Sequence, residues 1–529
     1  MNGPANTGKG FLPLDIAGVM NTGIEEWFAS YSDPVPSVFF YEIRDKLTRC
    51  FSENKPDASA KPDLHQIWLA NYKIVFLLSD YYFKYSMLIA AEKQGYAGLV
   101  TDVKMDFDTA RELYRKTIFS NVRIQRRPFP KNLVDRYRFI RQNKFDPGAF
   151  YPGFNDRRKN YIIGDRDRAE IKFYLEENGI DPYFINPTLL LSDGGKNLNS
   201  DQEEETKSIV DSFFSRIFAS FPETKEAFDE SVRRTIFEII IDKYRHYFTF
   251  FDTLSEYSIS GRDLIVCPCG NMLFRLFCCA WRRHGGTVTG FSHGNVYSYI
   301  YTPGDINNGS QLILDRYITC SKGETKLLED SRKDFRNGLE SRAVMETCRN
   351  SYYRTVFTSV RNGPAVDSVK KVMVVGFPYS FDVYNNMSYL HLEMSIVRTL
   401  KDAGFQVLYK AHPDSLSDAS AFFTGMTDSV ITDSFETVYN MADCVVFPIH
   451  YSTTFGFTLM TNRPIVIMES PLLTGWHPDV EGLIRKRCSS VKLSFNERSV
   501  FSFDREEFIR SIHESIKRTD QGIVETFAF

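Results

Sequence analysis

From residue 263 onward, short runs of β-branched and other apolar residues alternate with longer stretches of helical periodicity. Asp263–Cys267 and Thr287–Ser292 are typical of buried strands, and Asn271–His284 between them has the spacing of a helix. Strands that alternate with helices in this rhythm pair in parallel and are covered by helices on both faces. The alternation therefore predicts an α/β fold built on parallel sheets.

The same alternation starts again after a charged stretch of poor periodicity, 332–362. The expected strands are Lys371–Val375, Gln406–Tyr409, Asp443–Phe447 and Ile465–Met468, and the expected helices are Ser388–Ala403, Ser434–Met441 and Thr454–Thr461. The chain has 529 residues, and single cores stop growing at about 250 to 300 residues. We therefore expect two Rossmann-like α/β domains in tandem.

The amino-terminal half has a different character. Leu64–Lys93 and Glu203–Phe250 are long, aromatic and helical in period, and the segment 126–199 between them is rich in turn-forming residues. We expect four parts. They are a mainly helical extension at 1–255, a first Rossmann-like core at 256–345, a linker at 346–370 and a second Rossmann-like domain at 371–529.

Composition excludes several classes of protein. A formal net charge of −3 argues against a large, sequence-independent attraction to nucleic acid. No apolar run is long enough to cross a bilayer, and Met1–Met20 does not have the pattern of a signal peptide. The nine cysteines form no regular disulfide framework, which fits a reducing compartment. We expect a soluble intracellular protein.

Four cysteines lie close together in the sequence and need a separate interpretation. Cys267, Cys269, Cys278 and Cys279 do not have the spacing of the usual zinc sites, and the second pair falls in an expected helix. We interpret them as buried structural thiols.

Ligands of parallel α/β sheets bind beyond the carboxyl ends of the strands. Four loops at such ends carry polar residues suited to an anion. They contain His293, Gly294 and Asn295; Lys410, His412 and Pro413; His450 with Ser452, Thr453 and Thr454; and Glu469. Gly376 ends the strand Lys371–Val375 and is expected to line the same cleft.

Each loop has a functional and a structural interpretation. Ser452, Thr453 and Thr454 stand where a helix begins, so their hydroxyls and unpaired N–H groups suit a phosphate, although ordinary N-capping explains them equally well. Lys410 supplies a fixed charge and His412 a donor, unless a loop carbonyl satisfies this histidine.

The same reasoning applies to the remaining loop residues. Pro413 would stiffen the turn that presents Lys410 and His412. His293 could act as a general base or bind a leaving phosphate, and Gly294 permits close approach of the backbone.

Taken in order, these motifs resemble those of a known family. His293-Gly294, Asp315–Ser321, the Lys410-x-His412-Pro413 loop and Ser452–Met468 resemble glycosyltransferases of the two-Rossmann GT-B architecture. More narrowly, they are similar to bacterial surface-polysaccharide enzymes, among them CMP-Kdo and sialic acid transferases and CDP-glycerol glycerophosphotransferases. The resemblance covers residues 263–470.

The resemblance implies a nucleotide held mainly by the second domain. Lys410 and His412 would contact the phosphate or ribose, Ser452 to Thr454 would bind phosphate, and His293 would be the catalytic residue. The chain departs from the family in having Ser-Thr-Thr instead of a plain Ser-Ser pair, and no catalytic carboxylate can be matched. No persuasive metal-binding Asp-x-Asp motif is present, since Asp165–Asp167 reads as a solvated turn.

The implied activity is transfer of a sugar from a CMP-sugar or other nucleotide-sugar to a cell-surface polysaccharide or glycolipid, such as capsule or lipopolysaccharide. The nucleotide-sugar would be a co-substrate, with no metal and no other cofactor. The expected location is cytoplasmic, or peripheral at the inner face of the cell membrane beside membrane-bound assembly machinery. Two alternatives stay open: a sugar-nucleotide 2-epimerase of the same fold, and a non-catalytic glycan- or nucleotide-binding assembly protein.

Overall fold

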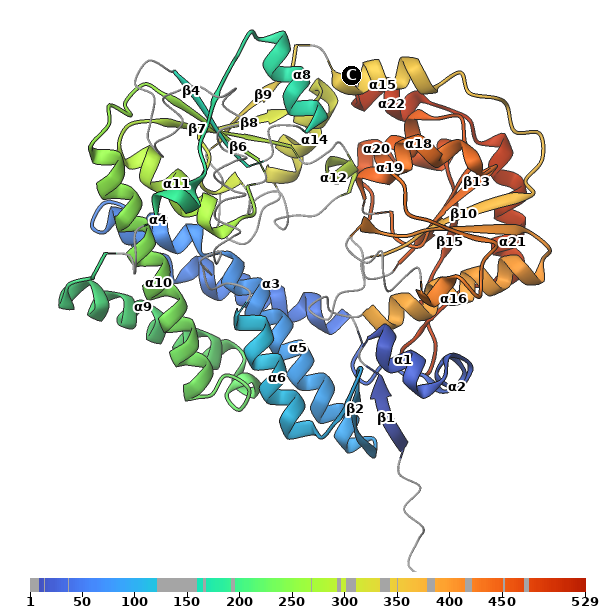
Figure 1. Cartoon of the computed structure of the whole chain (residues 1–529), viewed down its shortest axis with the longest axis horizontal. Coiled ribbons are helices and arrows are strands. Elements are labelled where there is room, and N and C mark those ends of the chain that lie inside the picture. The colour runs from blue at the N-terminus through green and yellow to red at the C-terminus, as the bar shows by residue number, and fades with distance from the viewer. Residues whose placement is uncertain are drawn as a thin grey trace, which may run out of the picture.

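The computed structural model describes most of the chain. The described residues are 9–13, 15–36, 38–120, 159–164, 168–191, 196–267, 269–292, 296–300, 311–333, 343–349, 351–377, 386–413, 421–450, 452–470 and 475–529. They form two α/β lobes that stand side by side above a layer of helices (Figure 1).

The first lobe is built on a six-stranded sheet in which every pairing is parallel. Its order is β5-β4-β6-β7-β8-β9. The strands are β4 (Asn160–Gly164), β5 (Tyr183–Phe184), β6 (Asp263–Cys267), β7 (Thr287–Phe291), β8 (Arg316–Thr319) and β9 (Val344–Thr347). The chain moves outward from β4 to β5 and returns on the other side of β4, so the strand order reverses between β4 and β6.

The second lobe also has a six-stranded parallel sheet, in the order β12-β11-β10-β13-β14-β15. Its strands are β10 (Lys371–Val375), β11 (Gln406–Lys410), β12 (Ser429–Ile431), β13 (Cys444–Phe447), β14 (Ile465–Glu469) and β15 (Ser489–Lys492). This is the strand order of the dinucleotide-binding Rossmann fold, and it reverses between β10 and β13. Two Rossmann-like domains, the fold class expected from the sequence, are confirmed.

Helices cover both sheets, as parallel strands require. Around the first sheet lie α8 (Ala169–Glu177), α11 (Met272–Arg283) and α14 (Lys322–Lys333). Around the second lie α16 (Asn386–Asp402), α18 (Phe435–Val438), α19 (Thr453–Met460), α20 (Pro478–Arg487) and α21 (Arg505–Glu514). Between the two lobes, α12 (Val296–Tyr299) contacts α14 and α19, and α15 (Tyr352–Val360) contacts α8 and α19. A short antiparallel hairpin, β16 (Ser494–Phe495) and β17 (Phe501–Ser502), follows β15.

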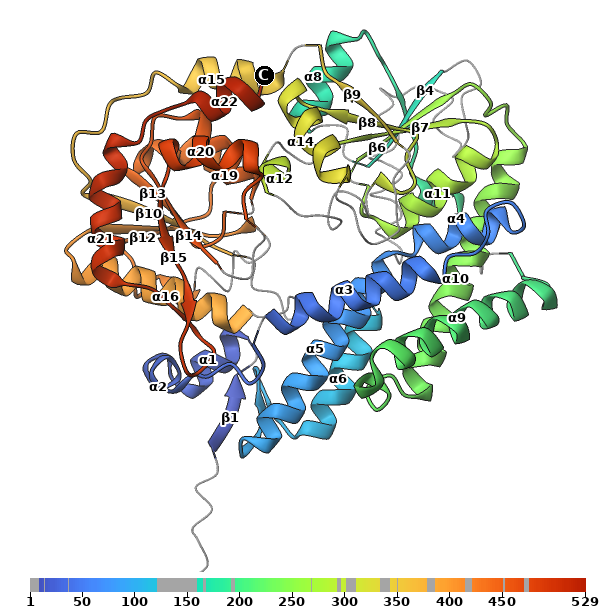
Figure 2. The same ribbon diagram turned by 180° about the vertical axis from the view of Figure 1, so that it is seen from behind.

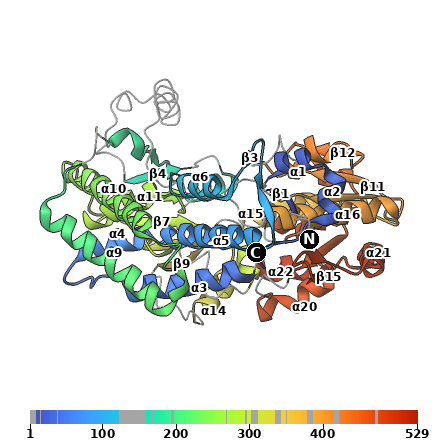
Figure 3. The ribbon, with the colours of Figure 1, turned by 90° about the horizontal axis from the view of Figure 1, so that it is seen from below.

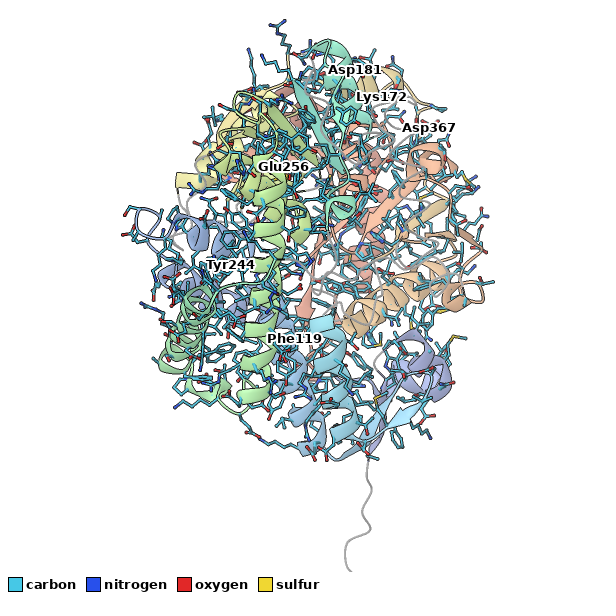
Figure 4. The ribbon with its side chains drawn as sticks, turned by 60° about the vertical axis from the view of Figure 1, so that its left-hand side comes forward. Phe119, Lys172, Asp181, Tyr244, Glu256 and Asp367 are labelled. Atoms are coloured by element: carbon cyan, nitrogen blue, oxygen red, sulfur yellow. The ribbon has the colours of Figure 1, made fainter. Side chains whose placement is uncertain are left out.

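The helical layer packs on the first lobe. It consists of α3 (Val38–Glu53), α4 (Pro62–Ala70), α5 (Lys73–Lys93), α6 (Phe107–Ser120), α9 (Ser200–Ser220) and α10 (Glu230–Ser255). Helix α10 lies along α11, and Figure 4 shows Tyr244 midway along α10 and Glu256 at its end beside the first lobe. The buried Arg275 of α11 connects the helical layer to the first domain, because its guanidinium donates to the carbonyls of Leu69 and Ala70 in α4 at 2.8 and 2.9 Å.

Aromatic side chains form much of the core of this layer, which explains their abundance in the sequence. Phe51 of α3 stacks on Trp68 of α4 with ring centroids 4.4 Å apart, and both are fully buried. Among the described helices, α5 alone has the length and composition of a membrane span, and 56% of its most apolar stretch is buried against the protein. Its packing against α3 and α6 accounts for that composition.

The first described residues lie beside the second lobe. Strand β1 (Lys9–Pro13) pairs with β2 (Tyr96–Val100), which pairs with β3 (Lys104–Met105). Helices α1 (Ile16–Thr22) and α2 (Ile24–Ser30) lie beside α16, whereas α9 and α10 lie under the first lobe (Figure 3). The helical extension therefore contacts both domains.

The carboxyl-terminal helix α22 (Gly522–Phe527) also connects the two domains, because the end of the chain packs against the first domain. Ser321 of the first domain donates its hydroxyl proton to the carbonyl of Phe527, and Ser351 donates to that of Ala528. A Cβ at Gly323 would lie 2.4 Å from the Cα of Phe527, so only glycine allows this contact.

Two parts of the chain belong to the first domain although the sequence analysis placed them elsewhere. Strands β4 and β5 lie within the range 1–255, and the end of β9 lies within the range 346–370. These strands are short and are flanked in the sequence by polar residues, so the sequence alone does not show that they join the sheet. They belong to it because β4 pairs with β6 and β9 pairs with β8. The first sheet is therefore wider than the expected core at 256–345.

The four neighbouring cysteines, Cys267, Cys269, Cys278 and Cys279, are buried and form no disulfide bond. Asp165–Asp167, expected as a solvated turn, lie outside the described residues.

Candidate functional site

Three of the four polar loops predicted from the sequence, those with Lys410, Ser452 and Glu469, follow strands that end at the carboxyl edge of the second sheet. In the sheet register Val375 pairs with Lys410 and Phe447 pairs with Ile467, so β11, β10, β13 and β14 end at the same edge. The order of the strands reverses here, between β10 and β13. This is the position where ligands of doubly wound sheets bind.

Lys410 is the last residue of β11, and its side chain is buried. Its ammonium group donates to the carbonyl of Ala411 at 2.7 Å. Burial lowers the pKa of Lys410, and the nearby carboxylates of Glu436 and Asp433 oppose that shift. His412 is half-buried and Pro413 is exposed. Lys410 is thus a cation held at the sheet edge by its own loop.

Beside Lys410, a buried carboxylate holds the start of the loop after β10. Glu393 of α16 is fully buried and accepts hydrogen bonds from the backbone N–H of Phe377 at 2.8 Å and from the Tyr409 hydroxyl at 2.6 Å. The Tyr409 hydroxyl in turn explains Gly376, where a Cβ would lie only 2.2 Å from that oxygen. The sequence analysis missed Glu393, although an acidic residue within the apolar run Leu390–Val397 is a visible signal.

Helix α19 begins at the same edge with an open amino terminus. Ser452 is its N-cap, and its hydroxyl oxygen accepts from the N–H of Phe455 at 3.2 Å. The N–H groups of Thr453 and Thr454, in the first turn, have no acceptor within the helix. Thr453 is exposed and Thr454 half-buried. These two N–H groups and the hydroxyls beside them can therefore donate to an anion.

His450 and Glu469 support this edge from within. His450 is buried, its ring lies 4.4 Å from that of Trp476, and burial lowers its pKa to about 4, so it is neutral at pH 7. Glu469 accepts from the indole N–H of Trp476 at 3.3 Å and forms an ion pair with Arg485. Both side chains take part in packing around Trp476.

The first domain contacts the second beside α19. Helix α12 packs against α19, the carbonyl of Tyr299 accepts from the N–H of His477 at 2.8 Å, and Ile300 forms an isolated β-bridge with Trp476. Figure 1 shows α12 between the lobes, next to α19 and α20. The residues before α12, namely His293, Gly294 and Asn295, lie outside the described residues.

A second buried carboxylate lies just before that segment. Ser292 donates its hydroxyl proton to Glu324 of α14, and Glu324 also accepts from the N–H of Cys320 at 2.7 Å. Burial raises the pKa of Glu324 to about 7. Sequence analysis missed this residue because Ser321 and Glu324 have the pattern of an ordinary capping box.

Polar side chains also gather where the strand order of the first sheet reverses. The guanidinium of Arg168, next to α8, pairs with Glu170 at 3.3 Å and donates to the thiol of Cys267 at 3.5 Å. The hydroxyl of Tyr353 donates to Glu170 at 3.2 Å. These residues were missed because the segment around Arg168 resembles a loop in sequence.

Within the described ranges, no group of three or more His, Cys, Asp or Glu side chains is arranged to hold a metal ion.

No family model and no curated protein matches the chain. Among solved structures, Os79 from O. sativa in complex with UDP and deoxynivalenol-3-glucoside is 12% identical with a TM-score of 0.38, covering 70% of this chain and 95% of its own. A putative UDP-N-acetylglucosamine 2-epimerase from Listeria monocytogenes is 10% identical, with a TM-score of 0.35 and coverage of 74% and 88%. Arabidopsis thaliana UGT89C1 is 10% identical, with a TM-score of 0.34 and coverage of 69% and 84%. Likeness at this level transfers no functional role.

Proposed function

We propose that this protein is a nucleotide-sugar-dependent glycosyltransferase that holds the nucleotide phosphate at the carboxyl edge of the second sheet. The observation that carries the proposal is the convergence of Lys410, the open amino terminus of α19 and Gly376 at the point where the strand order reverses. A cation, unpaired N–H groups and a close backbone approach are the features that recognise a phosphate.

The chemistry follows from the charge of the leaving group. When the bond between the sugar and the nucleotide breaks, negative charge develops on the phosphate oxygens. The N–H groups of Thr453 and Thr454 and the ammonium of Lys410 would stabilise this charge as it forms, without a bound metal. In this scheme the phosphate replaces the carbonyl of Ala411 as the partner of Lys410. His412 would reach the ribose or a phosphate oxygen.

The first domain would supply the acceptor side. Its contact with α19 through α12 brings the segment that follows His293 close to the second domain. We assign His293 as the catalytic base for the acceptor hydroxyl and Gly294 and Asn295 as residues of the cleft wall. A CMP-sugar is the first donor to test, and a cell-surface polysaccharide or glycolipid the first acceptor, with the protein in the cytoplasm or at the inner face of the membrane.

A thermal-shift screen with CMP, CDP, UDP, GDP and TDP tests the nucleotide site. A ligand at one hundred times its dissociation constant stabilises the folded protein by about 2.7 kcal/mol, which is readily measured. We expect at least one pyrimidine nucleotide to raise the melting temperature of the wild type and of Thr358→Ala, a control at an exposed position on α15. The shift should be reduced in Lys410→Ala. No shift with any nucleotide would contradict the proposal.

Product analysis then separates the activities. A nucleotide-sugar incubated with a lipid-linked glycan should release free nucleotide and extend the glycan. Isomerisation of a UDP-sugar without acceptor would identify an epimerase instead. Unchanged glycan synthesis in both His293→Ala and His412→Ala would indicate a non-catalytic binding protein.

A further inference from the structure

A hollow of about 300 Å³ lies where three segments distant in sequence meet. Its walls come from α2, from α16, and from the hairpin β16–β17 with the start of α21. In Figure 2 the red hairpin descends past α16 toward α1 and α2. One wall thus belongs to the amino-terminal segment and the others to the second domain.

The floor of the hollow is aromatic and apolar. Tyr31, Val500 and Phe501 are buried, and Phe28 and Phe503 are half-buried. These rings are held firmly by their neighbours. The ring of Phe28 stacks on His391 at 4.3 Å with the guanidinium of Arg398 4.0 Å from its centroid. His391 and Arg398 thus cover the faces of the Phe28 ring, so its edge and the half-buried Phe503 supply the apolar surface of the hollow.

The rim of the hollow is cationic. Arg498 and Arg505 are exposed and line it, and Arg498 donates one N–H to the carbonyl of Ala29. The Arg505 side chain makes no ion pair or hydrogen bond with any described residue. Burial lowers the pKa of His391 to about 4, so this lining residue adds no charge at pH 7.

Among the described residues, no Asp or Glu lines the hollow. Arg505 stands between Asp504 and Glu506, neither of which lines the hollow, and the Asp504 carboxylate accepts from the N–H of Glu507 at 2.9 Å and caps α21. Two guanidinium groups above an aromatic floor, with no lining carboxylate to neutralise them, favour an anion that carries a ring.

We propose that this hollow binds a small aromatic anion, with its ring against the edge of Phe28 and the half-buried Phe503 and its carboxylate or phosphate held by Arg498 and Arg505. The volume is at the lower end of small-molecule pockets, which suits one ring with one anionic group. Because the ligand touches α2 and the hairpin together, it links the amino-terminal segment to the second domain. The site is separate from the proposed nucleotide site and does not depend on it.

Phenyl phosphate is the probe, and phenol and inorganic phosphate are its two halves. Binding to the full chain is measured by titration calorimetry. We expect saturable binding of phenyl phosphate to the wild type, weaker binding of either half, and about a tenfold loss of affinity in Arg505→Gln, the size expected for one charged hydrogen bond. Arg510→Gln removes the same charge from the same helix outside the hollow and should bind like the wild type.

Two further variants make the test decisive. Ser395→Phe fills the hollow from α16 and should abolish binding, with its melting temperature confirming that it folds. Ser452→Ala, at the proposed nucleotide site, should leave binding unchanged. The proposal is overturned if phenyl phosphate does not bind saturably, if Arg505→Gln and Ser395→Phe bind like the wild type, or if Ser452→Ala alone loses binding.

Discussion

Replacement of Glu393 by alanine tests whether a buried carboxylate organises the candidate site. In the folded protein this side chain is fully buried and accepts from the N–H of Phe377 and from the hydroxyl of Tyr409. Alanine removes the acceptor of both hydrogen bonds. Because Phe377 begins the loop after β10, the loss is expected at the point where the strand order reverses.

The magnitude follows from the two hydrogen bonds. A hydrogen bond to a charged group contributes about 1.5–3 kcal/mol, so the loss of both costs about 3 kcal/mol or more. For a domain of the size of residues 371–529, a loss of 3 kcal/mol lowers the melting temperature by about 6–12 °C. Glu393→Gln keeps one acceptor oxygen, so its effect should be about half as large.

Two measurements check this expectation. Calorimetry gives the melting temperature of the second domain, and hydrogen exchange followed by mass spectrometry reports the N–H of Phe377 directly. In Glu393→Ala the peptide containing Phe377 should exchange faster than in the wild type, while peptides of α10 should not change. A melting temperature within 1–2 °C of the wild type, with unchanged exchange at Phe377, would refute the reasoning, because the expected loss is several times larger.

Three further predictions concern other parts of the fold. Ser452→Ala removes the N-cap of α19 and should lower the free energy of unfolding, measured with a chemical denaturant, by about 1 kcal/mol. The same variant should bind nucleotide more weakly, and an unchanged affinity would show that Ser452 only caps the helix. Burial raises the pKa of Glu324 from 4.5 to about 7, so the folded state favours its protonated form. The stability that protonated Glu324 contributes is complete below about pH 4.5 and is lost as the pH rises to 7. Over that range the unfolding free energy of the wild type should therefore fall relative to that of Glu324→Gln. Parallel pH profiles of the two proteins would contradict this prediction. Arg487 is fully buried and donates to the carbonyls of Leu459, Thr458, Thr461, Arg463 and Arg518; Arg487→Lys has too few donors and should lower the unfolding free energy by about 2 kcal/mol or more, whereas an unchanged value would show that water replaces the guanidinium.

Some residues of the candidate site can be predicted from the local sequence and others cannot. Lys410 and Ser452 could be found because Lys410 ends the apolar strand β11 and Ser452 lies in the loop after β13, and the carboxyl end of a parallel strand is where ligands bind. The surroundings of these residues could not be found in the same way. His450 and Glu469 also follow strands, yet they pack around Trp476, which lies further along the chain.

The sequence by itself determined the local elements. The period of the apolar residues fixed the strands Asp263–Cys267, Arg316–Thr319 and Lys371–Val375 with the bounds that the structure has, because a buried strand must be apolar along its length. The sequence also shows that Gly376 ends the strand Lys371–Val375. The reason for a glycine there, the nearby hydroxyl of Tyr409, is visible only in the folded structure.

Only the tertiary structure decided which distant segments meet. The pairing of β4 with β6 joins residues about one hundred positions apart, and the contacts of Glu393 with Phe377 and Tyr409 depend on how α16 packs on the sheet. The hollow beside Arg498 and Arg505 forms from segments at opposite ends of the chain. Local periodicity cannot encode such contacts, because they arise from the burial of complementary surfaces after the elements have formed.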